Sequence, residues 1–179
     1  TDPIGLEIRQ TTFAFKREGP LNNMVFVKFQ AFNRGAKVIQ NCYFSLWSDP
    51  DLGGAGDDLV GCDTGKSLGF CYNADNDDAD YGNTPPAVGY DFFQGPLVYT
   101  GDAGDIGKAW GTAWPGYKNL GMASFNKYIN GTDPSNYVES YNYMNGLNID
   151  GSPLANGTTF MYPGDPVAGT GELDFAPAD

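Results

Sequence analysis

Glycine and proline recur throughout the chain and limit the length of any regular element that it can form. The 179 residues include 25 glycines and 12 prolines. Glycine weakens the interior of a helix and proline interrupts it, so long helices are excluded. The chain also holds 12 phenylalanines, 11 tyrosines and 3 tryptophans, which are residues that strands favour. The sequence therefore predicts a single all-β or β-dominated domain.

Residues 4–15 carry the first strand pattern. Apolar side chains alternate with polar ones, slip phase once and then alternate again, as in a strand with a bulge. The apolar positions are Ile4, Leu6, Ile8, Phe13 and Phe15. The polar residues 16–23, which contain Gly19-Pro20, then predict a turn or a hinge.

Two further strand patterns, residues 24–33 and 38–48, are separated by the short polar segment 34–37. This arrangement predicts a β-hairpin. Cys42 alternates with apolar residues in the second run, which predicts a buried free thiol. Shorter strands are expected at 90–93, 158–162 and 172–175.

Residues 133–146 form the one segment that predicts a helix. Asp133 is placed to cap its N-terminus, Pro134 suits the first helical position, and Gly146 suits the stop. The expected apolar face consists of Tyr137, Tyr141 and Met144.

Residues 49–105 carry a strong excess of negative charge: they hold 12 of the 22 acidic residues and one basic residue, Lys66. Carboxylates with so little counter-charge repel one another, and a bridging cation relieves that repulsion. Oxygen atoms of Asp, Asn and backbone carbonyls are typical calcium ligands. The sequence therefore predicts structural Ca²⁺. The expected ligands form two groups, Asp49, Asp51, Asp57 and Asp58 around a glycine-rich turn, and Asp75, Asp77, Asp78 and Asp80 with Asn73 and Asn76.

Neither acidic group matches an EF-hand. Counted from Asp75, the third ligand position is occupied by Ala79, and no glutamate closes the loop. The calcium prediction thus depends on composition, and a solvated acidic loop that serves solubility remains the alternative.

The charge and the absence of histidine exclude several classes of function. A net charge of −12 argues against nucleic acid and anionic membranes as partners. Without histidine, Ser-His-Asp and Cys-His centres and His-ligated zinc are excluded. The one catalytic arrangement left is a pair of carboxylates of the glycosidase type among Asp91, Asp102 and Asp105. Nothing in the sequence fixes the distance between these carboxylates. We therefore expect no enzymatic activity. No apolar run approaches the roughly 20 residues of a membrane-spanning helix.

Two cysteines and the start of the chain bear on its compartment. Cys62 and Cys71 flank residues 63–70, and a local disulfide closing a hairpin is expected in an oxidising compartment. The chain starts at Thr1-Asp2-Pro3 without an apolar targeting segment, as expected of a chain processed after export.

Trp110, Trp114 and Tyr117 lie close together in the segment WGTAWPGY. Flat aromatic rings of this kind bind sugars in carbohydrate-binding modules. Alternatively, these rings cover a small core of their own segment.

Several long motifs resemble a module of secreted bacterial cell-surface proteins. They are SDPDLGGAGDDLVGCDT, GFCYN, TPPAVGYDFFQGP, LGMASFNKYING, SYNYMNGL and FMYPGDPVAGTGELD. The similarity spans residues 24–175, and Cys62 and Cys71 match the module whereas Cys42 does not. The resemblance implies an Ig-like β-sandwich with a long decorated insertion in an extracellular protein, and implies no activity.

In that module further strands follow the last motif, whereas this chain stops at Asp179. A sandwich that ends early is expected to leave an open edge, and open edges pair with strands of other chains. With an N-terminal strand and a hinge, this predicts donor-strand exchange, as in the pilus-like fibrils of Ig-like subunits that the chain also resembles. The alternative is that residues 4–15 fold back and pair within their own domain.

The predicted organisation is therefore a donor strand at 1–15, a hinge at 16–23 and an Ig-like β-sandwich at 24–179 with an insertion at about 49–146. The predicted function is that of a structural, calcium-stabilised subunit of an extracellular fibril. The alternative function is a secreted carbohydrate-binding or adhesion module.

Overall fold

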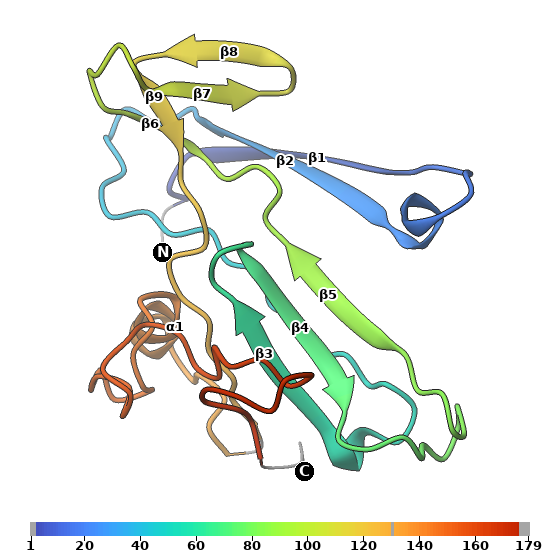
Figure 1. The fold of residues 1–179 in the computed structure, drawn as a ribbon. Coiled ribbons are helices and arrows are strands. Elements are labelled where there is room, and N and C mark those ends of the chain that lie inside the picture. The colour runs from blue at the N-terminus through green and yellow to red at the C-terminus, as the bar shows by residue number, and fades with distance from the viewer. Residues whose placement is uncertain (1–2, 130, 176–179) are drawn as a thin grey trace. The chain divides into compact units, whose positions relative to one another are not determined.

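The computed structural model describes residues 3–129 and 131–175 (Figure 1). The chain divides into two compact units, Thr1–Cys42 and Tyr43–Asp179. The described residues form nine β-strands, two short 3-10 helices and one α-helix. The prediction of a β-dominated fold with one short helix is therefore confirmed.

The first unit is an antiparallel pair of strands, β1 (Leu6–Ala14) and β2 (Val25–Asn33), joined through the 3-10 helix η1 (Pro20–Asn23). Leu6 lies opposite Asn33, and Ala14 lies opposite Val25. The strand predicted at 4–15 is thus confirmed over Leu6–Ala14, and its partner is a strand of the same chain. The predicted bulge is wrong, because the register runs without interruption from Leu6 to Ala14.

The predicted pairing of 24–33 with 38–48 is wrong, because residues 38–48 form no strand and β2 pairs with β1 instead. Aromatic contacts favour the observed partner: the Phe13 and Phe26 rings stack with their centroids 5.2 Å apart. Gly19, with φ of 83°, begins the turn that returns the chain. Cys42, predicted to be buried, is exposed because its run lies outside any sheet.

The centre of the second unit is a three-stranded antiparallel sheet in the order β3-β4-β5 (Figure 1). Its strands are β3 (Asp58–Asp63), β4 (Leu68–Asn73) and β5 (Ala87–Asp91). The short 3-10 helix η2 (Ala55–Asp57) precedes β3. All three strands lie in the acidic segment 49–105, where the sequence showed no regular period and predicted one strand, at 90–93.

A second sheet has the order β6-β9-β7-β8. It comprises β6 (Leu97–Tyr99), β7 (Ile106–Ala109), β8 (Thr112–Pro115) and β9 (Tyr117–Asn119). A two-residue turn, Trp110-Gly111, joins β7 to β8, and both residues have positive φ (51° and 83°). Positive φ at both positions is the signature of a type I′ hairpin turn.

The helix α1 spans Tyr137–Met144, so it begins later than the sequence predicted. Asn136, rather than Asp133, caps it: the Asn136 side chain accepts hydrogen bonds from the backbone N–H groups of Val138 and Glu139. Gly146, with φ of 71°, follows the helix as predicted. Tyr137 is 85% exposed and does not contribute to a buried face.

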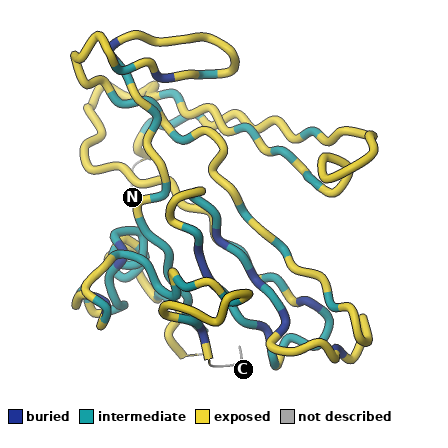
Figure 2. The backbone as a smooth tube through the Cα atoms, viewed as in Figure 1, coloured by how far each residue is buried: buried dark blue, intermediate teal, exposed yellow. Residues whose placement is uncertain are grey.

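Buried residues recur along β3 and β4 (Figure 2), where Asp58, Cys62, Cys71 and Asn73 share one face of the sheet. Cys62 and Cys71 lie on this face, and Leu52 and Leu154 complete the buried apolar set among the described residues. Phe125 covers Gly69 so closely that a Cβ there would lie 2.7 Å from the ring.

Later segments of the chain close the outer edge of β3. The backbone N–H of Cys62 donates to the carbonyl of Tyr162 at 3.1 Å, and that of Val60 donates to the Asp174 carboxylate at 3.0 Å. The strands predicted at 158–162 and 172–175 are therefore wrong as strands. Each segment nevertheless supplies one oxygen acceptor, the Tyr162 carbonyl or the Asp174 carboxylate, for an N–H group at the edge of β3.

The predicted Cys62–Cys71 disulfide is not formed, and all three cysteines are free thiols. Cys62 lies opposite Gly69 and Cys71 opposite Val60, so the two cysteines are diagonal neighbours on one face. The Cα atoms of diagonal neighbours lie roughly 7–8 Å apart. The Cα atoms of a disulfide usually lie about 4.4–6.8 Å apart, so this arrangement is too wide for a bridge. Burial raises the pKa of each thiol to about 12, which leaves them unreactive.

We expect D174N to destabilise the second unit by about 3 kcal/mol, because it removes the charge that neutralises a buried lysine. The Asp174 carboxylate accepts from Lys127 Nζ at 2.7 Å, and both side chains are buried. Urea unfolding measures the change. D63N, which breaks the exposed pair with Lys66, is the control and should leave the unfolding midpoint unchanged. Equal effects of the two variants would contradict the prediction.

Candidate functional site

The β1–β2 hairpin contains the residues predicted to bind a partner. Leu6 and Ile8 share one face of the hairpin, and Ile8 is 56% exposed. The register places apolar residues of β2 on the same face, and Val25, Val27 and Phe29 are all exposed. We call Leu6, Ile8, Val25, Val27 and Phe29 the apolar face of the hairpin. The sequence missed the β2 members because it paired β2 with another segment.

The other predicted partner residues do not share this face. Phe13 points to the opposite side, where it contacts Phe26 and Phe15. Ile4 precedes β1 and is exposed. The structure therefore brings together two of the five predicted residues, Leu6 and Ile8, and adds three from β2.

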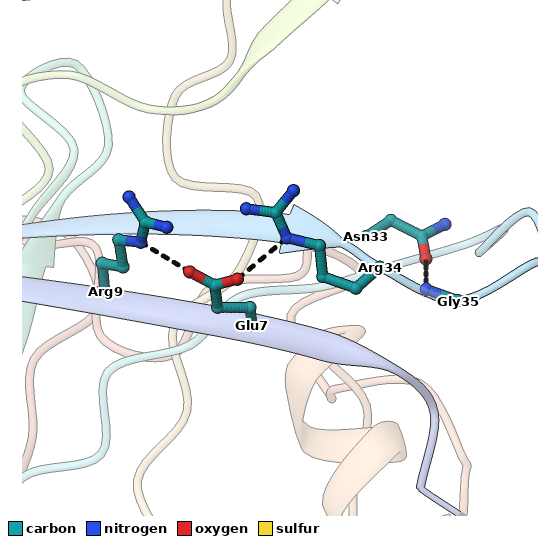
Figure 3. A network of polar contacts seen from close by, with 5 residues as sticks. All are labelled: Glu7, Arg9, Asn33, Arg34 and Gly35. Atoms are coloured by element: carbon teal, nitrogen blue, oxygen red, sulfur yellow. Dashed lines mark hydrogen bonds and ion pairs between the residues drawn. The ribbon is translucent and has the colours of Figure 1, made fainter.

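Polar contacts fix the open end of the hairpin (Figure 3). The Glu7 carboxylate accepts from the guanidinium groups of Arg9 and Arg34, and Asn33 Oδ1 accepts from the backbone N–H of Gly35 at 3.0 Å. The Gly5 carbonyl accepts from the N–H groups of Arg34 and Gly35. These contacts fix the register of β1 against β2.

The sheet of the hairpin has two strands, so each strand has an outer edge with no neighbouring strand among the described residues. A two-stranded hairpin is at best marginally stable in water. An open edge beside an exposed apolar face is a template for another strand.

The acidic segment brings one aspartate of each predicted calcium group to the same loop. Asp58 Oδ2 accepts from the backbone N–H of Leu52, and Asp78 Oδ2 accepts from that of Gly54, both at 2.8 Å. Gly53 lies between Leu52 and Gly54, and a Cβ at Gly53 would overlap the Asp78 carboxylate. The loop therefore closes tightly over the Asp78 carboxylate.

The other predicted calcium ligands do not converge with this pair. Five of them are exposed: Asp49, Asp51, Asp75, Asp77 and Asp80. Asp57 is half-buried. In the described part of the chain no three Asp, Glu, Cys or His side chains are grouped as a metal site.

Burial raises the pKa of Asp58, and the negative charges of Asp57, Asp51 and Asp78 raise it further, against the hydrogen bond from Leu52. Asp78 behaves in the opposite way: hydrogen bonds from the backbone, that of Gly54 first, lower its pKa. The surroundings therefore disfavour the charged form of Asp58 and favour the charged form of Asp78.

The aromatic group lies on the second sheet. Trp114 is 44% exposed, and its ring meets Tyr117 edge-on at 5.9 Å. Trp110 is exposed on the β7–β8 turn. Of the carboxylates considered for catalysis, Asp91 ends β5, and Asp102 and Asp105 lie in the turn before β7.

No protein-family model, curated protein or solved structure matches this chain at significant similarity. The resemblance inferred from the motifs therefore remains a prediction. Among the described residues, no helix is long and apolar enough to cross a bilayer.

We expect G53A to lower the free energy of unfolding by at least about 1 kcal/mol, because Gly53 has a φ of 77° and a methyl group there would displace the Asp78 carboxylate. G56A is the matched control, since a Cβ at Gly56 meets nothing within 4 Å. Urea unfolding of both variants measures the difference. A stable G53A protein would contradict the close approach of this loop to Asp78.

Proposed function

We propose that this chain is a structural subunit of an extracellular, pilus-like fibril of the bacterial cell surface. In this proposal the second unit is the Ig-like sandwich, the acidic segment binds structural Ca²⁺, and copies assemble by exchange of β1. The observation that carries the proposal is that β1 and β2 form a unit of their own with an exposed apolar face.

In a single copy β1 pairs with β2, which is the alternative that the sequence left open. Strand donation then replaces one partner by an identical one: β1 of one copy pairs with β2 of the next in the same register. Such an exchange makes the same backbone hydrogen bonds between chains as within one chain, so its cost in free energy is small. Because donor and acceptor surfaces differ, each added copy exposes a new acceptor, and a fibre results.

The segment between the strands suits a hinge. Gly19 adopts a φ of 83°, and no heavy atom lies within 4 Å of where its Cβ would be. Outside η1 the connection has no regular structure, and its residues are exposed. The connection can therefore extend without losing buried contacts of its own.

The direct test is a cysteine pair placed across β1 and β2. Thr11 and Lys28 are opposite each other in the register, and T11C/K28C in a C42S background places a crosslink there. We expect oxidation of assembled material to give covalent ladders on non-reducing gels, because β1 bonds to the β2 of a neighbour. Crosslinking before assembly should trap each hairpin and abolish fibres in negative-stain micrographs.

The outcomes are distinct. Fibres that yield crosslinked monomers alone would overturn strand exchange, and a chain that forms no fibres would overturn the fibril itself. Deletion of residues 1–15 provides a second variant, which should remain monomeric. Persistence of fibres after this deletion would exclude β1 as the donor.

The exposed rings of Trp110 and Trp114 favour one alternative, a secreted carbohydrate-binding or adhesion module. Trp110 has the positive φ of the hairpin turn, which is uncommon for a bulky residue and holds its ring at the tip of the hairpin. The two functions are compatible, because a fibril subunit can also bind surface glycans.

We expect W114A to abolish any signal on a glycan array, because the ring supplies the flat apolar surface on which a sugar stacks. W47A is the control, since Trp47 is also exposed but lies outside this sheet. Binding that survives W114A, or that W47A removes equally, would rule out this aromatic group as the glycan site.

A further inference from the structure

Two buried oxygen atoms without hydrogen-bond donors lie at one end of β3 and β4. Asp58 begins β3, Asn73 ends β4, and the two residues are opposite each other in the register. Asp58 is 3% exposed and Asn73 is 8% exposed. Asp58 Oδ1 and Asn73 Oδ1 are both buried and have no hydrogen-bond partner. A buried acceptor without a partner costs free energy, so a pair of them requires an explanation.

The orientation of both groups is fixed by their other atoms. Asp58 Oδ2 is held by the N–H of Leu52, and Asn73 Nδ2 donates to the carbonyl of Asp75 at 3.2 Å. Rotating the Asn73 amide to present a donor would break that bond. Both side chains project from the same face of the sheet, because they are opposite each other in the register, and each carries one buried oxygen without a partner.

The surroundings add negative charge, and among the described residues no cation acts on Asp58. The charges of Asp57, Asp51 and Asp78 act on Asp58. Lys66, the one basic residue of residues 49–105, is bonded to Asp63 at the other end of β3. A buried carboxylate beside three others is stabilised by a bound cation.

We propose that Asp58 Oδ1 and Asn73 Oδ1 bind one calcium ion at this end of the sheet. The inference rests on the calcium part of the proposed function and replaces its two groups of ligands by one site. Calcium accepts six to eight oxygen ligands in flexible geometry, including neutral amide oxygens. Water molecules would complete the coordination. The ion would fasten the loop before β3 to the end of β4, which the second predicted group of calcium ligands follows.

Calorimetric titration of the chelator-treated full chain with CaCl₂ tests the site, with MgCl₂ as the competing probe. We expect D58N and N73A each to weaken Ca²⁺ binding at least about tenfold, because each removes one oxygen ligand or its charge. D77N is the matched control: it removes the same charge from an exposed residue of the same segment and should change the affinity by less than about threefold. At the same concentration, Ca²⁺ should also raise the melting temperature of wild type more than that of D58N.

The failures of the site and of the wider proposal are distinguishable. If D58N and N73A both bind Ca²⁺ as wild type does, the proposed site is wrong. Calcium binding elsewhere in the acidic segment would then still hold. A chain that binds no Ca²⁺ would overturn both. That result would also favour a proton on Asp58 shared with Asn73 Oδ1, and D58N would then keep wild-type stability by donating from its amide. Circular dichroism confirms that each variant is folded.

Discussion

The second unit depends on polar contacts between distant segments, because its apolar core is small. Leu52, Cys62, Cys71 and Leu154 are the buried apolar residues of the described chain, and four polar residues are equally buried. Backbone hydrogen bonds and the Asp174 carboxylate satisfy the edge of β3, and the N–H groups of residues 52 and 54 donate hydrogen bonds to Asp58 and Asp78. Each unmade contact of this kind would leave a buried polar atom unsatisfied. Loss of one buried carboxylate is therefore expected to destabilise this unit more than it would destabilise a domain with a larger apolar core.

The hairpin presents the opposite situation. Its strands meet through aromatic contacts and a charged network around Glu7, and most of its apolar side chains stay exposed. Such a ribbon gains much of its stability only when another surface covers it. Exchange of β1 between copies would keep this two-stranded pairing, so the packing of neighbouring copies in the proposed fibre would supply the surface that covers the apolar face.

The sequence predicted local features well and long-range pairing poorly. Alternation identified β1, and the turn residues identified the end of α1 at Gly146. The partner of β2 was missed because proximity in sequence favoured residues 38–48, whereas ring stacking of Phe13 on Phe26 favours β1. In the acidic segment, glycines at 61 and 69 interrupt the apolar alternation of β3 and β4. The composition indicated a cation, but only the register could place Asp58 opposite Asn73.

Hydrogen exchange of the β1 and β2 amides, compared between the monomer at low concentration and the assembled material, tests the central claim most directly. The account predicts fast exchange in the monomer and strong protection of both strands after assembly, with the protection of β3 and β4 unchanged. Assembly that leaves the β1 and β2 amides exchanging as fast as in the monomer would contradict it.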